Sequence, residues 1–196
     1  MLIGLISDTH IETWREVLPA QIGDAFRGVD LILHAGDVYL PSVLGELERI
    51  APVLAARGDD DTMVDIGGDS RLKGRHTLTV EGITLWLVHV KPYNWMLNPE
   101  EEVDAFRTLG EDVVVKPHFF RFDRNEEAYT FRPAHEVRPD VIVFGHTHAA
   151  QIESQNGILL VNPGSPTLPH YERELGTVAL LTINSGKVEA RIVQLE

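Results

Sequence analysis

Five short apolar segments of this chain are each followed, within a few residues, by side chains that bind metal ions. The segments lie at 2–6, 31–33, 53–56, 85–88 and 141–144. The side chains that follow them are, in order, Asp8 and His10, Asp37, Asp59, His89, and His146 and His148. In α/β folds ligands gather outside the carboxyl ends of the strands, so residues far apart in sequence can meet there. The pattern therefore predicts one site built at five strand ends.

The hydrophobic pattern predicts an α/β chain whose C-terminal part is antiparallel. Apolar residues at helical spacing predict helices over about 14–26 and 42–50, which alternate with the first strands and favour a parallel sheet with right-handed crossovers. Alternation around Gly82 predicts a hairpin over 78–87. A helix is expected over 100–109, and the remaining strands near 149–154, 158–162, 177–183 and 187–194.

Length and charge narrow the classes of protein that this chain can belong to. Its 196 residues predict a single domain over 1–196. With 17 Lys and Arg against 30 Asp and Glu, the formal charge is −13, which disfavours nucleic acid polymers and anionic membranes as partners. We find no long apolar run and no signal-peptide pattern, so we expect a cytoplasmic protein. The absence of cysteine leaves only nitrogen and oxygen ligands for a metal.

Seven such ligands are more than one ion takes. Buried together without cations, the carboxylates should have raised pKa values and the imidazoles should stay neutral. A mixed imidazole and carboxylate set suits Mn, Fe, Co, Ni or Zn better than Ca or Mg alone. The number of ligands fits two divalent ions about 3.5–4 Å apart that share a carboxylate. We expect Mn²⁺ above Fe, Ni, Co or Zn, with Asp37 as the bridge.

The order of these motifs resembles that of the calcineurin-like metallophosphoesterases, and in particular their small single-domain phosphodiesterases. That family shows Asp-x-His, Gly-Asp, Gly-Asn, a His after a strand, Gly-His-x-His and then Asn-Pro-Gly-Ser. The same order here is Asp8 and His10, Asp37, Asp59, His89, His146 and His148, and residues 162–165. The resemblance covers nearly the whole chain. It implies a four-layer α/β/β/α sandwich, in which helices flank two mixed β-sheets.

The same resemblance divides the ligands between two ions. It assigns the first ion to Asp8, His10, Asp37 and His148, and the second to Asp37, Asp59, His89 and His146. Asp37, Asp59 and His146 are also the expected catalytic residues. The implied reaction is hydrolysis of a small phosphodiester by a metal-bridging hydroxide that attacks phosphorus in line. The alternative is a non-catalytic, protein-binding scaffold on the same fold, as in the metallophosphoesterase-like subunit of retromer.

Three positions depart from the family pattern. Asp59 stands where the family usually has an Asn, Val90 stands where it has a Gly, and Asp60 stands where larger relatives carry a proton-donating His. An ionised Asp59 cannot donate a hydrogen bond to phosphate, and it adds negative charge. Its charge favours diesters, which carry one negative charge fewer than monoesters. The residue that protonates the leaving group stays unassigned.

The long interval between His89 and His146 predicts an inserted lid or hairpin at about 112–135, rich in aromatic residues and arginine. His118 and Arg121 in this interval, and His170 after the Asn-Pro-Gly-Ser turn, are candidate substrate-binding residues. The alternatives for the insertion are a dimer contact, which would make the protein a homo-oligomer, or a hairpin packed on itself. The other histidines, His34, His76 and His135, are expected to be structural.

Overall fold

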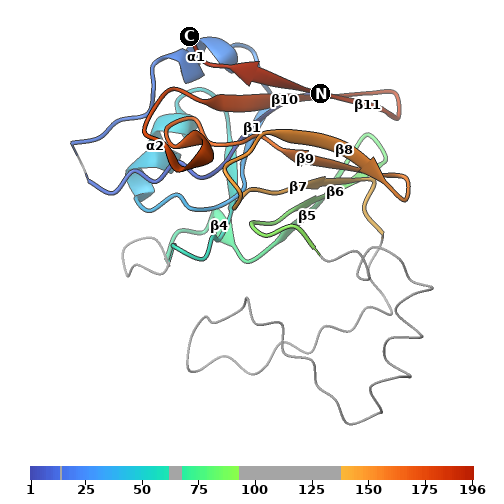
Figure 1. The fold of residues 1–196 in the computed structure, drawn as a ribbon. Coiled ribbons are helices and arrows are strands. Elements are labelled where there is room, and N and C mark those ends of the chain that lie inside the picture. Colours follow the sequence, from blue (N-terminus) through green and yellow to red (C-terminus); the bar gives the residue numbers. More distant parts are fainter. Residues whose placement is uncertain (14, 62–67, 93–137) are drawn as a thin grey trace. The chain divides into compact units, whose positions relative to one another are not determined.

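The computed structural model describes residues 1–13, 15–61, 68–92 and 138–196 (Figure 1). The chain divides into two units, one formed by Met1–Lys91 with Pro139–Glu196 and the other by Pro92–Arg138. The elements below belong to the first unit. The expected helix over 100–109 and the expected insertion at 112–135 lie outside the described residues.

The first sheet contains six strands in the order β11-β10-β1-β2-β3-β4. Their bounds are β1 Leu2–Ile6, β2 Leu31–His34, β3 Val53–Ala56, β4 Leu72–Lys73, β10 Thr177–Asn184 and β11 Lys187–Gln194. Strands β1 to β4 are parallel to one another, and Leu5 of β1 pairs with Leu33 of β2. On the other side of β1, strands β10 and β11 are antiparallel. The sheet is therefore mixed, with its parallel half formed by the N-terminal part of the chain.

The second sheet contains five strands in the order β5-β6-β7-β9-β8. Their bounds are β5 His76–Val80, β6 Ile83–Leu87, β7 Val141–Val143, β8 Gln151–Gln155 and β9 Ile158–Asn162. Strands β6, β7 and β9 are parallel, while the two edge strands are antiparallel. The four C-terminal strands expected from the sequence are confirmed, but they divide between two sheets: β8 and β9 join this sheet, and β10 and β11 join β1.

Three hairpins are closed by two-residue turns of the same kind. Both turn residues have positive φ, which is the type I′ geometry that matches the twist of antiparallel strands. The pairs are Glu81-Gly82 after β5, Asn156-Gly157 after β8 and Ser185-Gly186 after β10. The hairpin predicted around Gly82 is confirmed.

The helices are short, and a proline lies at or just before the first residue of each. Helix α1 spans Gln21–Ala25, although the apolar spacing predicts a helix from residue 14. It begins only after Pro19, because proline disfavours helical geometry at the residue before it. Helix α2 spans Pro41–Glu48, with Pro41 in the first turn, where its missing N–H costs nothing. A short 3-10 helix, η3, spans Pro169–Tyr171. No helix in the described part of the chain is long and apolar enough to span a membrane.

Two apolar clusters hold these layers together. Side chains on one face of the first sheet, such as Ile32 and Val53, pack against Ile22 of α1 and Leu44 of α2. The opposite face of that sheet packs against the second sheet through a cluster that includes Leu5, Leu33, Leu85, Val143 and Val161. Figure 1 shows the two sheets facing each other. The expected sandwich of two mixed sheets is confirmed, and α1 and α2 cover the first sheet.

Candidate metal centre

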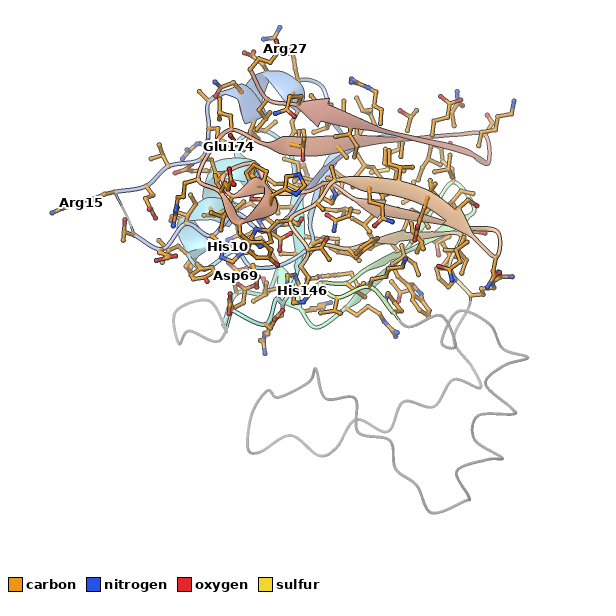
Figure 2. All side chains as sticks on the ribbon, viewed as in Figure 1. His10, Arg15, Arg27, Asp69, His146 and Glu174 are labelled. Atoms are coloured by element: carbon orange, nitrogen blue, oxygen red, sulfur yellow. The ribbon has the colours of Figure 1, made fainter. Side chains whose placement is uncertain are left out.

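The seven predicted ligands gather where strands of both sheets end. Asp8 and His10 follow β1, Asp37 follows β2 and Asp59 follows β3, while His89 follows β6 and His146 and His148 follow β7. Figure 2 shows His10 and His146 at the same end of the sheets. Their ligand atoms form two groups, each with all members within 4.8 Å of one another: Asp8, His10, Asp37 and His148 in the first, and Asp59, His89 and His146 in the second.

The first group is buried. The Nε2 atoms of His10 and His148 lie 3.1 Å apart, and His10 Nε2 lies 3.5 Å from Asp37 Oδ2. Asp8 Oδ1 completes the group at 3.8 Å from His148 Nε2. Two imidazole nitrogens and two carboxylates thus point at one small volume, as the ligands of a single cation do.

The second group is joined to the first by one oxygen atom. Asp59 Oδ1 lies 2.7 Å from His89 Nε2 and 3.3 Å from His146 Nδ1. Asp37 Oδ2, already in the first group, lies 3.4 Å from the same His89 Nε2. Asp37 therefore stands between the two groups, where a bridging carboxylate would stand.

Hydrogen bonds from the far side of two rings orient them toward the site. His89 Nδ1 donates to the carbonyl of Ala35 at 2.8 Å, and His148 Nδ1 donates to the carbonyl of Leu168 at 2.7 Å. In metal sites such bonds select the tautomer whose other nitrogen carries the lone pair. His89 Nε2 is buried, yet among the described residues no contact meets the geometry of a hydrogen bond. A buried nitrogen of this kind, beside carboxylates, fits a divalent cation.

The backbone of the ligand residues is strained. Five of the seven have φ in the left-handed region: Asp8 at 52°, His10 at 42°, Asp37 at 56°, His146 at 72° and His148 at 55°. Each such residue costs roughly 1–2 kcal/mol when it is not glycine. Strain of this kind persists where the surrounding structure holds a functional site in place.

Glycine allows the ligand loops to approach one another closely. A Cβ atom on Gly58 would lie 2.0 Å from Asp37 Oδ1, and one on Gly36 would lie 2.5 Å from His89 Nδ1. No other residue fits at either position without moving a ligand. The glycines beside the strand ends therefore let the backbone pass next to the site.

The electrostatics differ from the expectation of uniformly raised carboxylate pKa values. Burial raises the pKa of Asp8 to about 6, as expected. Burial would also raise the pKa of Asp37, but the close approach and the charge of His89 outweigh burial and lower it. The same ring lowers the pKa of Asp59 to about 2. The expectation is therefore wrong for Asp37 and Asp59.

The physical reason is that one imidazole takes up the positive charge. Burial disfavours a charged His89, but the adjacent carboxylates of Asp37 and Asp59 raise its pKa to about 11. His10, by contrast, has a pKa lowered by burial. Divalent ions bound between these carboxylates would supply the positive charge in place of His89.

Comparisons with known proteins identify the family to which this chain belongs. Residues 1–186 match the model of the calcineurin-like phosphoesterase superfamily domain. The chain belongs to this superfamily. It is 34% identical over 195 residues to a probable metallophosphoesterase of Methanothermobacter thermautotrophicus, covering 99% of this chain and 92% of that protein. It is 25% identical over 199 residues to a phosphodiesterase of Methanocaldococcus jannaschii, with all of both chains covered.

A solved structure shares the fold of this chain. The crystal structure of Vps29 from Entamoeba histolytica, complexed with Zn²⁺, has a TM-score of 0.60 at 19% identity, with 100% of each chain covered. At this level of identity, the likeness concerns the fold.

Of the three candidate substrate-binding residues, the structure describes only His170. His118 and Arg121 lie outside the described residues. His170 is exposed and belongs to neither ligand group, although its backbone N–H donates to the carbonyl of His148 at 3.4 Å. His34 and His76, expected to be structural, are buried and also lie outside both groups. His135 is not among the described residues.

Asp61 has a role near the ligand groups that sequence reasoning missed. The sequence suggests it only as another source of a metal-binding oxygen. Its buried carboxylate instead accepts hydrogen bonds from four backbone N–H groups: those of Asp37, Val38, Tyr39 and Gly58. Burial raises its pKa, while the bonds from Tyr39 and Gly58 act in the opposite direction. Asp61 thus fastens the loop of Asp37 to the loop that leads to Asp59.

Proposed function

We propose that this protein is a dinuclear metal-dependent phosphoesterase that hydrolyses small phosphodiesters. Asp8, His10, Asp37 and His148 would hold one divalent ion, and Asp37, Asp59, His89 and His146 the other. The observation that carries the proposal is the position of Asp37 Oδ2, which lies 3.5 Å from a ring nitrogen of the first group and 3.4 Å from one of the second. A single carboxylate oxygen shared in this way is the core of a two-ion site.

Two divalent ions would bring the pKa of bound water toward neutrality and neutralise charge on the phosphoryl oxygens. The protein's own part is to fix the ligands. Asp37 is held by the N–H of Asp60, which donates to its Oδ1 at 3.0 Å. Asp59 and His146, which are less buried than the first group, line the side of the site that substrate can reach. We propose Mn²⁺ as the ion, with Fe, Co, Ni and Zn as alternatives.

The charges around the site favour a diester over a monoester. Asp59 has a side chain 44% exposed, and the neighbouring Asp60 is also exposed. These carboxylates repel a phosphate dianion more than a diester monoanion. The relative from Methanocaldococcus jannaschii is itself named a phosphodiesterase. We propose His118, Arg121 and His170 as substrate contacts, in a single domain with an insertion at about 112–135.

The test is hydrolysis of bis(p-nitrophenyl) phosphate by chelator-treated protein, before and after Mn²⁺ is added. We expect Mn²⁺ to restore turnover in the wild type, and Asp37→Asn to lower it by at least about 100-fold. The matched control is Asp24→Asn, an exposed carboxylate on α1, which should leave turnover unchanged. In a second assay, the monoester p-nitrophenyl phosphate should be hydrolysed more slowly than the diester. Equal turnover in the wild type and Asp37→Asn would reject the two-ion proposal.

A second candidate function, a protein-binding scaffold, has one observation in its favour. Asp59 stands where the family usually has an Asn, and its carboxylate lies 2.7 Å from His89. It offers no hydrogen-bond donor to phosphate, which weakens catalysis. The sandwich is also the fold of Vps29. If the Mn²⁺-loaded wild type and Asp59→Asn are both inert toward phosphodiesters, the scaffold becomes the better proposal.

A further inference from the structure

The segment that follows β9 contacts two of the three loops that supply the first ligand group, the loop after β1 and the loop after β7. Ser165 Oγ donates to the carbonyl of Asp8 at 2.7 Å, and Thr167 Oγ1 donates to the carbonyl of Thr9 at 2.7 Å. Three residues after Ser165, the carbonyl of Leu168 accepts the hydrogen bond from His148 Nδ1. This segment therefore lies against the site, and its side chains can act on the ligands without being ligands themselves.

Tyr171, at the end of this segment, contacts both histidines of the loop after β7. Its ring stacks on the ring of His148, with centroids 4.2 Å apart and 23° between the planes. Its hydroxyl donates to the carbonyl of His146 at 3.2 Å. His148 belongs to the first ligand group and His146 to the second. One side chain thus touches a ligand residue of each group.

Neither burial nor backbone preference explains the position of Tyr171. Tyr171 is 66% exposed, so its ring contributes little to a hydrophobic core. Its φ is 64°, and that of His170 is 51°. Two successive non-glycine residues in the left-handed region cost free energy, and such strain clusters where a side chain must be placed for function. Here the strained backbone places the ring of Tyr171 against His148, a candidate metal ligand.

We propose that Tyr171 is a positioning residue for the two metal ions, an inference that rests on the metal pair of the proposed function. The stack fixes the plane of the His148 ring, so that Nε2 keeps its direction toward Asp8 and Asp37. The hydroxyl fixes the backbone of His146, which is itself in the left-handed region. Tyr171 thereby couples the geometry of the first group to that of the second.

The experiment measures metal binding rather than turnover. Chelator-treated wild type, Tyr171→Ala, Tyr171→Phe and Leu175→Ala are titrated with Mn²⁺ by calorimetry, and with Co²⁺ by visible absorption. Leu175 is the matched control because it is a partly exposed apolar residue four positions further on. We expect Tyr171→Ala to weaken Mn²⁺ binding about 10- to 100-fold and to shift the Co²⁺ spectrum. Tyr171→Phe keeps the stack and should lie between the wild type and Tyr171→Ala.

Two results would overturn the proposal. One is wild-type affinity and an unchanged Co²⁺ spectrum in Tyr171→Ala. The other is a loss of affinity in Tyr171→Ala that comes with an equal loss of unfolding free energy in the metal-free protein, since this would indicate a merely structural role. A wild type that binds two ions but hydrolyses no diester would refute the proposed function and leave this inference standing.

Discussion

Replacing Asp61 with asparagine isolates the role of one buried carboxylate in holding the ligand loops together. Oδ1 accepts from the N–H groups of Val38 and Tyr39 at 2.7 and 2.8 Å, and Oδ2 accepts from those of Asp37 and Gly58 at 3.0 and 2.8 Å. Asparagine keeps one oxygen and turns an NH₂ group toward the other pair of donors. Two buried N–H groups therefore lose their acceptor.

The expected cost follows from those two groups. Each buried donor left without a partner costs about 1–3 kcal/mol, and bonds to a charged acceptor lie toward the upper end of that range. We therefore expect Asp61→Asn to lower the free energy of unfolding by roughly 4 kcal/mol. The matched control is Asp60→Asn, because this exposed neighbour accepts a side-chain hydrogen bond only from the Tyr39 hydroxyl among the described residues. Its cost should stay below about 1 kcal/mol.

The assay is urea unfolding of both variants and the wild type in the presence of a chelator, so that metal binding does not contribute to stability. Chelator-free samples then report how far Mn²⁺ affinity falls in Asp61→Asn, since Asp37 is among the residues that Asp61 holds. Equal unfolding free energies for Asp61→Asn and Asp60→Asn would show that the four N–H contacts do not stabilise the loops, and would refute this reasoning.

Three further predictions concern other residues at or near the site. Burial lowers the pKa of His34 to about 3, so protons bind the unfolded chain preferentially as the pH falls below 6.5. Wild-type stability relative to His34→Gln should therefore decrease by about 1.4 kcal/mol per pH unit between pH 6.5 and about 3, measured by urea unfolding with chelator; a constant difference would contradict this. Gly36→Ala should cost about 3 kcal/mol, because its Cβ would collide with His89 at a φ of 99°, whereas Gly82→Ala, at a φ of 83° in open space, should cost about 1 kcal/mol. Similar unfolding midpoints for these two would disprove the collision. Asp59→Asn should raise diester turnover with Mn²⁺, because it removes a charge and adds a donor; lower turnover would count against repulsion by Asp59.

Much of the site could be predicted because its ligands follow strands whose periodicity is plain in the sequence. Asp8, Asp37 and His89 each lie two or three residues beyond a strand, and the convergence of those strand ends follows from the sheet rules alone. The hairpin turns could be predicted for the same reason, since glycine marks the position that needs positive φ.

The features that the sequence does not indicate are those that depend on contacts between distant segments. Nothing local in β10 shows that it pairs with β1 rather than with β9. The stack of Tyr171 on His148 requires left-handed backbone at two non-glycine residues, which no local preference favours. Asp61 looks like a third acidic ligand in its loop until the four N–H groups around it are known.

The ligands come from both sheets, and this has a mechanical consequence. All three carboxylates follow strands of the first sheet, while His89, His146 and His148 follow strands of the second, and each ligand group draws on both sheets. Ions bound there would act as cross-links between the sheets in a chain that has no cysteine to form a disulfide. Under a pulling force that separates the sheets, the metal-loaded protein would have to break coordinate bonds, whereas the chelated protein would have to break only apolar contacts and hydrogen bonds.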